Sequence, residues 1–581
     1  MCGILVTSGI PRPFHHRLLS GLKKRGPDSV GFWSDGRTNM AHTRLAILGL
    51  DDRGVEPLEN DTHVLVYNGE IYNFLDLSRR LAAEGAKITF ANDAETLLEG
   101  WSRWGEKILS EMNGFWAFSV YDKVKKRLYL VRDQLGIKPL YYWKGPDGLI
   151  GSSLLGPMLQ AAGHAPELDY RAMSEYVRYQ FTFGDKTFLK PVKKVMAGHL
   201  VEYDLESGAL TSRCYEDIFA HSGGGTERAT SEWVDRTRTL LAECCVDSTI
   251  SDTSFTTFCS GGVDSSAITR LTNPEIAYHC NYSDPECNET FYAQQVVEGT
   301  NVRLFVVNAA EDFNLVDRLR GIVEDFDELT IGSVILPLED LLSQVKRRYK
   351  VILTGTGGDE LFAGYVRYQL AMGSCFHDSY RAMFAKMHAL TSPAARFELT
   401  HSKGDPTFYK FYEPQVVDTF HDAYAACGPD GDEMRRMLTF DRRYFLAGLL
   451  NIDDKMCGRH SLESRPSFLH QKFVRHMQNL DTRDMLIGDE LKYIGKQLAG
   501  GILPKSVIHR KDKMGFTTPI GTFVNRSSHL VREQLTGSRF RDLYDLRRMN
   551  LTAETKFSRE VFGLVMLDLW LNRYATSTSA H

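Results

Sequence analysis

The chain has 581 residues, of which 43% are hydrophobic and 25% are charged, and its formal net charge is -5. This length suits about two to four domains, and the composition excludes a peptide hormone, a disulfide mini-scaffold and a largely disordered chain. Basic and acidic residues number 69 and 74. The net charge therefore provides no general attraction to nucleic acid or to anionic membranes, and we expect neither as a partner.

In chain order, short apolar or alternating runs predict strands in the first 215 residues. These runs cover residues 3–7, 63–67, 115–121, 127–131 and 140–143. Apolar residues spaced three and four apart predict amphipathic helices over residues 74–85 and 94–112. Together they predict an α+β layered domain.

A side-chain-poor stretch, H-S-G-G-G-T over residues 221–226, predicts a linker. We therefore divide the chain into residues 1–215, a linker over 216–230, and residues 231–581. Predicted helices and strands alternate after the linker, which favours an α/β domain with a parallel sheet. The predicted helices cover 232–245, a segment after Ser265, and 290–299; the predicted strands cover 254–259, 276–282, 302–307 and 350–353. From Gly364 onward the pattern is mostly helical.

Ten cysteines include no C-x-x-C pair, which fits neither a zinc ribbon nor a disulfide framework. Reduced thiols of this kind are typical of the cytosol. The sequence has no stretch of about 18 predominantly apolar residues, so we expect no membrane span. The first residues do not resemble a signal peptide. We therefore expect a cytoplasmic protein with no membrane partner.

Cys2 precedes an apolar strand, so removal of Met1 would place a thiol and a free α-amine on one residue. An α-amine with a pKa of about 8 can accept the thiol proton, and the nucleophile then carries its own base. Taken alone this signal is weak, because an N-terminal cysteine before a strand is more often a matter of ordinary packing.

Polar motifs at the ends of the predicted strands supply the context for Cys2. They read R-G-P-D (25–28), H-T-R-L (42–45), Y-N-G-E-I-Y-N (67–73), N-D-A-E (92–95) and R-D-Q-L-G-I-K-P (132–139). With Cys2, they make residues 2 to about 205 resemble the class II glutamine amidotransferases, which have the αββα N-terminal-nucleophile fold. Glu56 is a departure, because relatives usually carry glutamine before the corresponding proline.

This resemblance implies a role for each matching residue. Cys2 attacks the side-chain amide of glutamine and releases ammonia. The guanidinium of Arg44 suits the substrate α-carboxylate. Asp93 and Glu70 face the α-ammonium, while the side chain of Asn68 and the backbone N–H of Gly69 stabilise the tetrahedral oxyanion.

A second motif, F-C-S-G-G-V-D-S-S over residues 258–266, lies between a predicted strand and a predicted helix. Tight glycine turns, serine hydroxyls and a helix N-terminus form an anion cradle, whereas the spacing and lysine of a Walker A loop are absent. The motif resembles the PP-loop of ATP pyrophosphatases, which adenylate a carboxylate. The implied ATP-binding residues are Phe258, Ser260, Gly261, Gly262, Asp264, Ser265, Ser266, Thr354 and Gly355.

Adenylation requires Mg²⁺, which prefers carboxylate and phosphate oxygens. Asp264 lies in the loop, and Asp359 follows the last predicted parallel strand, so both should reach the carboxyl end of the sheet. We predict them as the metal ligands. Lys513, in R-K-D-K-M-G-F over residues 510–516, matches the lysine that relatives place against pyrophosphate.

A glutaminase followed by an AMP-forming synthetase resembles the asparagine synthetase family from residue 2 to about 574. The family reaction uses glutamine, ATP and a carboxylic acid, and joins ammonia to an acyl-adenylate. The resemblance also implies an ammonia tunnel and a homodimer.

Departures from the family lie near the acceptor segments. Thr356 replaces a usual acidic residue near the acceptor, and Ser467 and His470 replace a proline and an aspartate. Three alternatives stay open: the same chemistry on a carboxylate other than aspartate, in secondary-metabolite, peptide or polysaccharide synthesis; a non-catalytic nucleotide or glutamine sensor; and an enzyme with one of the two activities. The complete catalytic set disfavours the last two.

Overall fold

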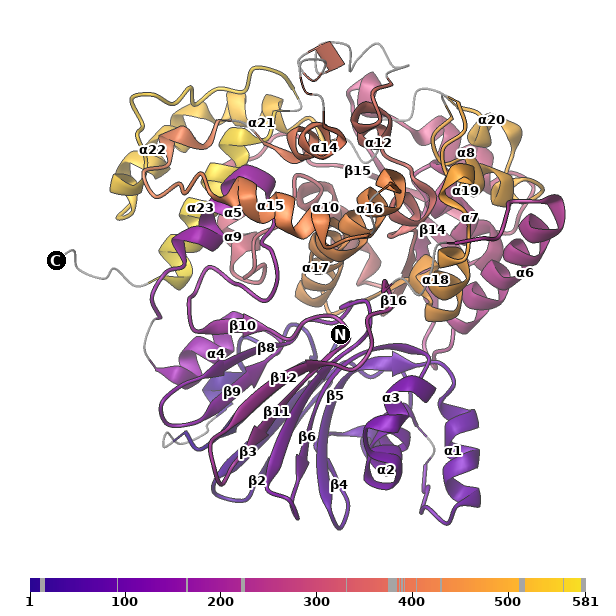
Figure 1. Cartoon of the computed structure of the whole chain (residues 1–581), viewed down its shortest axis with the longest axis vertical. Helices are drawn as coiled ribbons and strands as arrows, with labels where there is room; N and C mark the ends of the chain where they lie inside the picture. The colour runs from indigo at the N-terminus through magenta and orange to yellow at the C-terminus, as the bar shows by residue number, and fades with distance from the viewer. Residues whose placement is uncertain are drawn as a thin grey trace.

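The computed structural model spans residues 1–581. It describes all of them except 11–15, 91, 164–165, 221–224, 331, 375–383, 386, 388–389, 391, 404, 429–430, 489, 511–517, 557 and 576–581. Figure 1 shows a β-rich N-terminal part below a larger, mostly helical C-terminal part, with the N-terminus at their junction. The linker predicted over 216–230 falls partly outside the described residues, so the predicted division stays a prediction.

The N-terminal part contains two six-stranded sheets whose paired strands are antiparallel. The first has the order β10-β8-β9-β1-β3-β2 and the second β12-β11-β7-β6-β5-β4. The first consists of β1 (Gly3–Ser8), β2 (Ser29–Ser34), β3 (Thr38–Arg44), β8 (Tyr141–Lys144), β9 (Leu149–Ser152) and β10 (Val192–Lys194). The second consists of β4 (Leu58–Glu59), β5 (His63–Ile71), β6 (Gly114–Asp122), β7 (Arg127–Arg132), β11 (His199–Asp204) and β12 (Leu210–Cys214).

The alternation of side chains along each strand builds four layers. On β5, Val64 and Val66 pack against Ile4 of the other sheet, whereas Leu65 faces the opposite side. That opposite side is covered by α1 (Phe74–Ala83), α2 (Asp93–Trp104) and α3 (Ile108–Glu111), and α4 (Leu155–Ala162) covers the outer face of the first sheet. The predicted αββα fold is confirmed.

One helix prediction in this part is wrong. The segment 94–112 is not a single helix, because α2 ends at Trp104 and a 3-10 turn precedes α3. Gly105 follows Trp104 with φ 58°, a conformation that favours glycine and ends an α-helix.

The C-terminal part is built on a five-stranded parallel sheet in the order β15-β14-β13-β16-β17. Its strands are β13 (Phe255–Phe258), β14 (Ile276–Asn281), β15 (Arg303–Asn308), β16 (Val351–Thr354) and β17 (Glu463–Pro466). After β13 the chain adds β14 and β15 on one side of this strand, and then β16 and β17 on its other side. In open sheets of this kind, ligands bind at the carboxyl ends of strands beside such a switch. The predicted parallel sheet is confirmed, and β17 is an addition to it.

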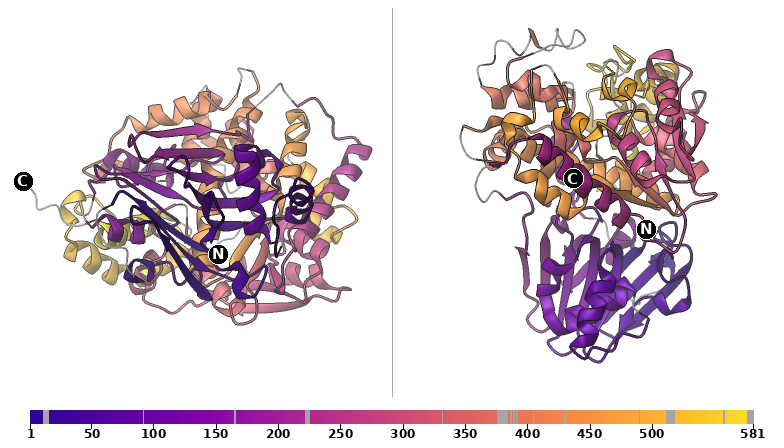
Figure 2. Two further views of the ribbon diagram at one scale, coloured as in Figure 1. Left: turned by 90° about the horizontal axis from the view of Figure 1, so that it is seen from below. Right: turned by 90° about the vertical axis from the view of Figure 1, so that its right-hand side faces the viewer.

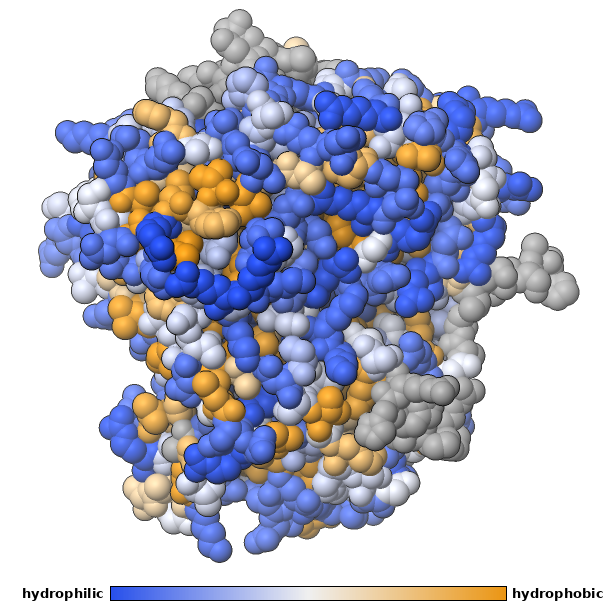
Figure 3. All heavy atoms as spheres, turned by 180° about the vertical axis from the view of Figure 1, so that it is seen from behind, coloured by the Kyte–Doolittle hydropathy of each residue, from blue (hydrophilic) through white to orange (hydrophobic). Residues whose placement is uncertain are grey.

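Helices cover the sheet and form the rest of this part, as predicted. They are α6 (Ser231–Asp247), α7 (Val263–Thr272), α8 (Thr290–Val297), α9 (Leu315–Val323), α10 (Ile335–Val345), α11 (Gly358–Phe362), α12 (Val366–Ala371), α14 (Pro393–His401), α15 (Val416–Ala425), α16 (Glu433–Phe440), α17 (Leu446–Arg459), α18 (Gln471–Gln478), α19 (Tyr493–Ala499), α20 (Lys505–Ile508), α21 (Ile520–Arg526), α22 (Ser528–Gly537) and α23 (Glu560–Tyr574). Within the described ranges, no helix is both long enough and apolar enough to cross a membrane. From behind, Figure 3 shows hydrophilic side chains over much of the surface and a local apolar area on the upper half.

A cluster of buried charges joins the two parts of the chain. Arg25 of the N-terminal part pairs with Asp454 of α17 at 2.6 Å, and both side chains are 2% exposed. Lys138 lies 3.5 Å from Glu463, and Arg465 pairs with Glu70 and Glu463, each at 2.9 Å. We call these six residues, Arg25, Glu70, Lys138, Asp454, Glu463 and Arg465, the interdomain charge cluster. Its three cations and three carboxylates are balanced, which burial requires.

The first prediction concerns this cluster. The variant Asp454→Asn leaves the Arg25 guanidinium buried without a carboxylate, and removing one partner of a buried pair costs about 3–5 kcal/mol. Urea denaturation should show that loss in the free energy of unfolding. The control is Asp76→Asn, because the Asp76–Arg79 pair is 68% and 76% exposed and surface pairs contribute about 0–1 kcal/mol. Equal effects of the two variants would contradict the assignment.

Candidate active sites

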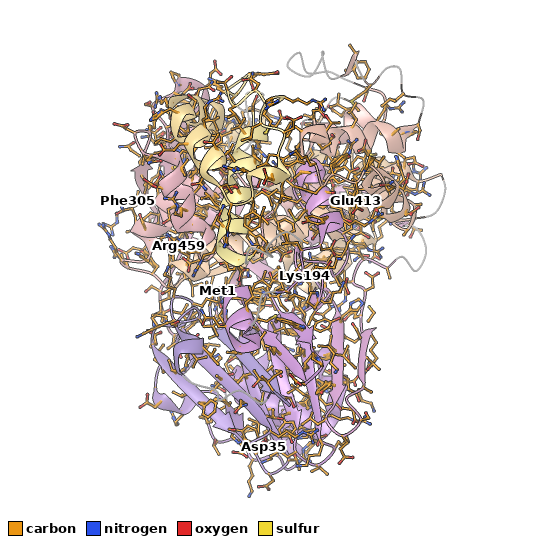
Figure 4. The ribbon with its side chains drawn as sticks, turned by 90° about the vertical axis from the view of Figure 1, so that its left-hand side faces the viewer. Met1, Asp35, Lys194, Phe305, Glu413 and Arg459 are labelled. Carbon is orange, nitrogen blue, oxygen red and sulfur yellow. The ribbon has the colours of Figure 1, made fainter. Side chains whose placement is uncertain are left out.

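Cys2 directly precedes β1 and lies at the junction of the two parts. Met1 is buried next to it, and Figure 4 shows Met1 at the level where the two parts meet. The backbone N–H of Cys2 donates to Oδ1 of Asn68 at 2.9 Å, and the Cys2 Sγ accepts from the backbone N–H of Leu45 at 3.5 Å. Burial raises the pKa of the Cys2 thiol. In this environment the thiol needs a base to become a nucleophile.

Asn68 and Gly69 occupy the centre of β5 beside this thiol. Nδ2 of Asn68 is buried and has no hydrogen-bond partner among the described residues, so it is a free donor near Cys2. A Cβ atom at Gly69 would lie 2.2 Å from the carbonyl oxygen of Phe115. The strand pairing of β5 with β6 therefore admits only glycine at this position.

The structure places the other three predicted glutamine-binding residues around the same end of the sheet. Arg44 donates to the carbonyl oxygens of Asp51 at 2.7 Å and Leu48 at 3.1 Å, which orients its guanidinium. Asp93 accepts from the hydroxyl of Tyr67 at 2.9 Å, and burial raises its pKa to about 6. Glu70 instead pairs with Arg465 of the C-terminal part, so this carboxylate belongs to the interdomain charge cluster.

Glu56, the departure from the usual glutamine, is buried behind this site. One of its oxygens accepts from the backbone N–H of Tyr67 at 2.5 Å, and the other lies 3.8 Å from Nε2 of His42. Burial raises the pKa of Glu56 to about 8. A protonated glutamic acid has the shape of glutamine and one donor, so near neutral pH it can take the place of the amide.

The second prediction tests this protonation. A carboxyl group whose pKa rises from 4.5 in the unfolded chain to about 8 in the folded one gives stability that is complete below pH 4.5 and is lost as the pH rises to about 8. Glu56→Gln removes this loss. The stability of the variant minus that of the wild type should therefore increase by about 1–4 kcal/mol between pH 5 and pH 8 in urea denaturation. A difference that does not change with pH would sink this interpretation.

The second predicted site begins at the end of β13. The loop turns at Gly261, whose φ is +76°, and a Cβ atom there would lie 2.7 Å from Cβ of Tyr292. Within the loop, the hydroxyl of Ser265 accepts from the backbone N–H of Ser260 at 3.0 Å, and the two hydroxyls lie 2.9 Å apart. Helix α7 starts at Val263 and its N-terminus opens on this loop, which suits an anion. Gly262, the N-cap of α7, and the helix residue Ser266 complete the predicted set in this loop.

The loop after β16 packs directly against the first one. A Cβ atom at Gly355 would lie 2.8 Å from the backbone nitrogen of Ser265, and one at Gly358 would lie 2.6 Å from Cγ of Asp264. Glycine at both positions therefore allows the two loops to touch. The structure thus brings Thr354, Gly355 and Asp359 to the same crevice as residues 258–266.

Lys492 lies between the two carboxylates predicted to bind metal. Its Nζ forms an ion pair with Asp264 and lies 2.9 Å from Asp359. Although burial lowers the pKa of Lys492, the two carboxylates raise it above its ordinary value. The sequence analysis missed this residue because L-K-Y-I-G-K over 491–496 resembles an ordinary amphipathic helix. Within the part of the chain that the structure describes, no group of three or more histidine, cysteine or acidic residues is arranged for a metal.

Lys513 lies outside the described residues, but Arg510 of the same segment reaches the loop. It donates to the carbonyl oxygen of Gly261 at 3.1 Å, pairs with Glu289 at 2.7 Å, and lies 3.7 Å from the ring centre of Tyr292. The basic segment therefore starts at the crevice. A hollow beside it is lined by Phe258, Ser260, Tyr278, His279 and Glu289, among others. Its mixed aromatic and polar lining is typical of small-ligand sites.

The third prediction concerns Lys492. The variant Lys492→Met leaves Asp264 and Asp359 without their cation, which should lower the stability by about 2–4 kcal/mol in metal-free buffer. Because a hard cation binds carboxylates, added Mg²⁺ should raise the Tm of the variant more than that of the wild type. Lys496→Met, which removes a lysine of the same helix paired with Glu490 at 3.0 Å, is the control. Equal Mg²⁺ responses in all three proteins would argue against a metal site here.

The structure separates the three departures from the family pattern. Thr356 lies in the crevice, where its hydroxyl donates to Oδ2 of Asp453 at 2.6 Å. His470 instead stacks on Tyr72 of the N-terminal part, with ring centres 5.6 Å apart, and lies 3.2 Å from Asp247. Ser467 precedes it in the same buried turn. Of the changes at Thr356 and His470, the first therefore lies in the crevice, whereas His470 belongs to the contact between the two parts.

Comparison with known proteins covers both parts of the chain. Residues 1–216 match the glutamine amidotransferase domain family, and residues 236–572 match the asparagine synthase family. The glutamine-hydrolyzing asparagine synthetase 3 of Bacillus subtilis is 26% identical over 526 residues, which cover 85% of this chain and 82% of that protein. The glutamine-hydrolyzing asparagine synthetase 1 of the same organism is 25% identical over 94% of this chain and 91% of its own length. Amidase chry2 of Gibberella zeae is 27% identical over 68% of this chain and 65% of its own length.

Proposed function

Because the chain belongs to the asparagine synthase family, we propose that it is an amidotransferase that uses glutamine and ATP to convert a carboxylic acid into an amide. The products besides the amide are glutamate, AMP and pyrophosphate. One observation carries this proposal: helix α17 connects the two sites in one chain. Its Asp454 pairs with Arg25 beside Cys2, and its Asp453 contacts Thr356 in the turn that packs against residues 258–266.

In the proposed glutaminase reaction, removal of Met1 frees the α-amine of Cys2 beside Oδ1 of Asn68. The amine accepts the thiol proton, and Sγ attacks the amide carbon of glutamine. Nδ2 of Asn68 and the N–H of Gly69 stabilise the oxyanion; each such donor contributes about 3–4 kcal/mol in other enzymes. Ammonia leaves, and water then releases glutamate from the thioester.

We propose that Arg44 binds the α-carboxylate of glutamine and that Asp93 and Glu70 face its α-ammonium. Asp93 is a buried carboxylate without a salt bridge among the described residues, and this supports an ammonium partner. For Glu70, the proposal requires that the carboxylate serve both the substrate and Arg465. Two oxygens with about four acceptor sites allow both contacts.

We propose that ATP binds with its phosphates on residues 260–266 and its adenosine in the hollow beside Phe258. Asp264 and Asp359 would hold Mg²⁺, because this hard cation prefers carboxylate oxygens, and the Lys492 ammonium that now lies between them would move aside. When bound, Mg²⁺ would neutralise phosphate charge during adenylation. Thr354 and Gly355 would contact the nucleotide, and Lys513 and Lys492 would supply positive charge to the departing pyrophosphate.

Ammonia released at Cys2 has to reach the acyl-adenylate before water protonates it. Helix α17 is the direct connection, because Asp454 belongs to the interdomain charge cluster and Asp453 faces the crevice. We therefore propose that ammonia passes along this helix within the protein.

The names of the Bacillus subtilis relatives favour L-aspartate as the acceptor. The neutral Thr356 favours a second candidate, which is the same chemistry on a different carboxylate in secondary-metabolite, peptide or polysaccharide synthesis.

A homodimer is a further proposal that rests on the family resemblance. A cytoplasmic location is supported by the free cysteines of the described chain.

The fourth prediction tests the division of labour between the sites. Cys2→Ala should abolish glutamate formation from glutamine but keep AMP and amide formation with ammonium chloride, because the synthetase crevice is untouched. Mass spectrometry of products from ATP and a panel of acids, starting with L-aspartate, measures both and identifies the acceptor. Cys214→Ala, at an exposed cysteine, is the control. An active wild-type protein that retains its initiating methionine, or that forms ADP in place of AMP, would falsify the proposal.

A further inference from the structure

Asp453 presents a carboxylate to the crevice from an element that the predicted site did not include. It lies on α17, and its Oδ2 accepts from the hydroxyl of Thr356 at 2.6 Å. The Thr356 hydroxyl also lies 3.3 Å from that of Thr354, at the end of β16. Asp453 and Thr356 are both partly exposed, and the turn that carries Thr356 packs against the loop of Asp264.

The charge environment of Asp453 differs from that of the neighbouring acids. Asp454 pairs with Arg25, and Asp264 and Asp359 share Lys492. Asp453 has no salt bridge among the described residues; its partners are threonine hydroxyls. Burial raises the pKa of Asp453 to about 6, and the hydrogen bonds from Thr356 and Thr354 oppose the rise. An acid that keeps its proton weakly near neutral pH and has no counterion is suited to accept a proton.

The position of Asp453 links the two sites. The turn that carries Thr356 also carries Gly355 and Gly358, which touch the loop of Asp264. On α17, the next residue, Asp454, faces the interdomain charge cluster, where Arg25 also donates to the carbonyl oxygen of Cys2 at 2.9 Å. Asp453 therefore lies on the helix that joins the surroundings of Cys2 to the crevice.

We propose that Asp453 is a positioning residue for amide formation, which accepts the proton of the attacking nitrogen through the hydroxyl of Thr356. The inference rests on the proposed function and adds its proton acceptor. Nitrogen forms a bond to the acyl carbon, and the carbon–oxygen bond to AMP breaks, with its electron pair leaving on AMP. One proton passes from the nitrogen to the Thr356 oxygen, while the Thr356 proton passes to the Asp453 carboxylate. The carboxylate of Asp453 thus takes the place of an acidic side chain at position 356.

The test separates adenylation from amide formation, with ammonium chloride as the nitrogen donor. Exchange of labelled pyrophosphate into ATP reports adenylation, and mass spectrometry reports the amide. Asp453→Asn keeps the hydrogen bond to Thr356 but cannot take the proton. Because a proton acceptor contributes about 100-fold or more, the kcat for the amide should fall by about that factor. The pyrophosphate exchange and the KM for ATP should change by less than about threefold.

Two further comparisons exclude a purely structural role. Asp568→Asn removes another buried carboxylate that accepts from hydroxyls, those of Ser538 and Tyr544, and it should leave the kcat unchanged. The double variant Thr356→Glu with Asp453→Ala places the carboxylate at position 356 and removes it from position 453. Its kcat should reach at least a tenth of the wild-type value, which is about 10-fold above that of Asp453→Asn.

The proposal and the function beneath it fail in different ways. Wild-type protein that forms no AMP with any acid overturns the proposed function. Wild-type protein that forms AMP, together with an Asp453→Asn variant of unchanged kcat, overturns only the role of Asp453. If Asp453→Asn does not fold, Thr356→Val and Thr356→Ser decide: a hydroxyl relay requires loss in the first and retention in the second, and equal rates refute it.

Discussion

A balanced set of buried charges between the two parts of the chain is the constraint on which the rest of the structure depends. Three cations and three carboxylates can be buried together only if each finds its partner, since an unpaired buried charge costs several kcal/mol. Arg25 satisfies Asp454 and also holds the carbonyl oxygen of Cys2. The same contacts that join the two parts therefore fix the position of the thiol. The right-hand view of Figure 2 shows the N-terminus at the junction of the two parts.

The crevice depends on a second constraint, the close approach of two loops at the switch point of the parallel sheet. Gly355 and Gly358 leave no room for a Cβ atom against Ser265 and Asp264. This contact brings two carboxylates from different loops near enough to share the Lys492 ammonium. Backbone packing therefore forms this site, and it determines where the charged side chains lie.

The sequence predicted the layered fold and the parallel sheet, because alternating and helical patterns report burial. It also predicted residues that the structure brings together near Cys2 and at the crevice, because motifs at strand ends are local; their roles stay predictions. It did not predict Lys492 or Asp453, since each looks like an ordinary helix residue until the fold places it against another segment. Strand β17 was missed as well: its sequence, E-S-R-P, has no apolar pattern, and it is buried only because Glu463 and Arg465 find partners across the interface. Pairing between distant charges is a tertiary property that spacing along the chain does not reveal.

Helix α17 carries Asp453 and Asp454 side by side, and each serves a different part of the protein. Side chains of consecutive helix residues point about 100° apart, so one turn of the helix can contact two different surfaces, here the interdomain charge cluster and the crevice. The rotation of this helix about its axis therefore fixes the directions of both side chains. A single residue inserted or deleted upstream in the helix would turn both acids away from their partners. Chimeras that exchange the N-terminal part with that of a relative will have to preserve this rotation of α17, even where the exchanged surfaces otherwise match.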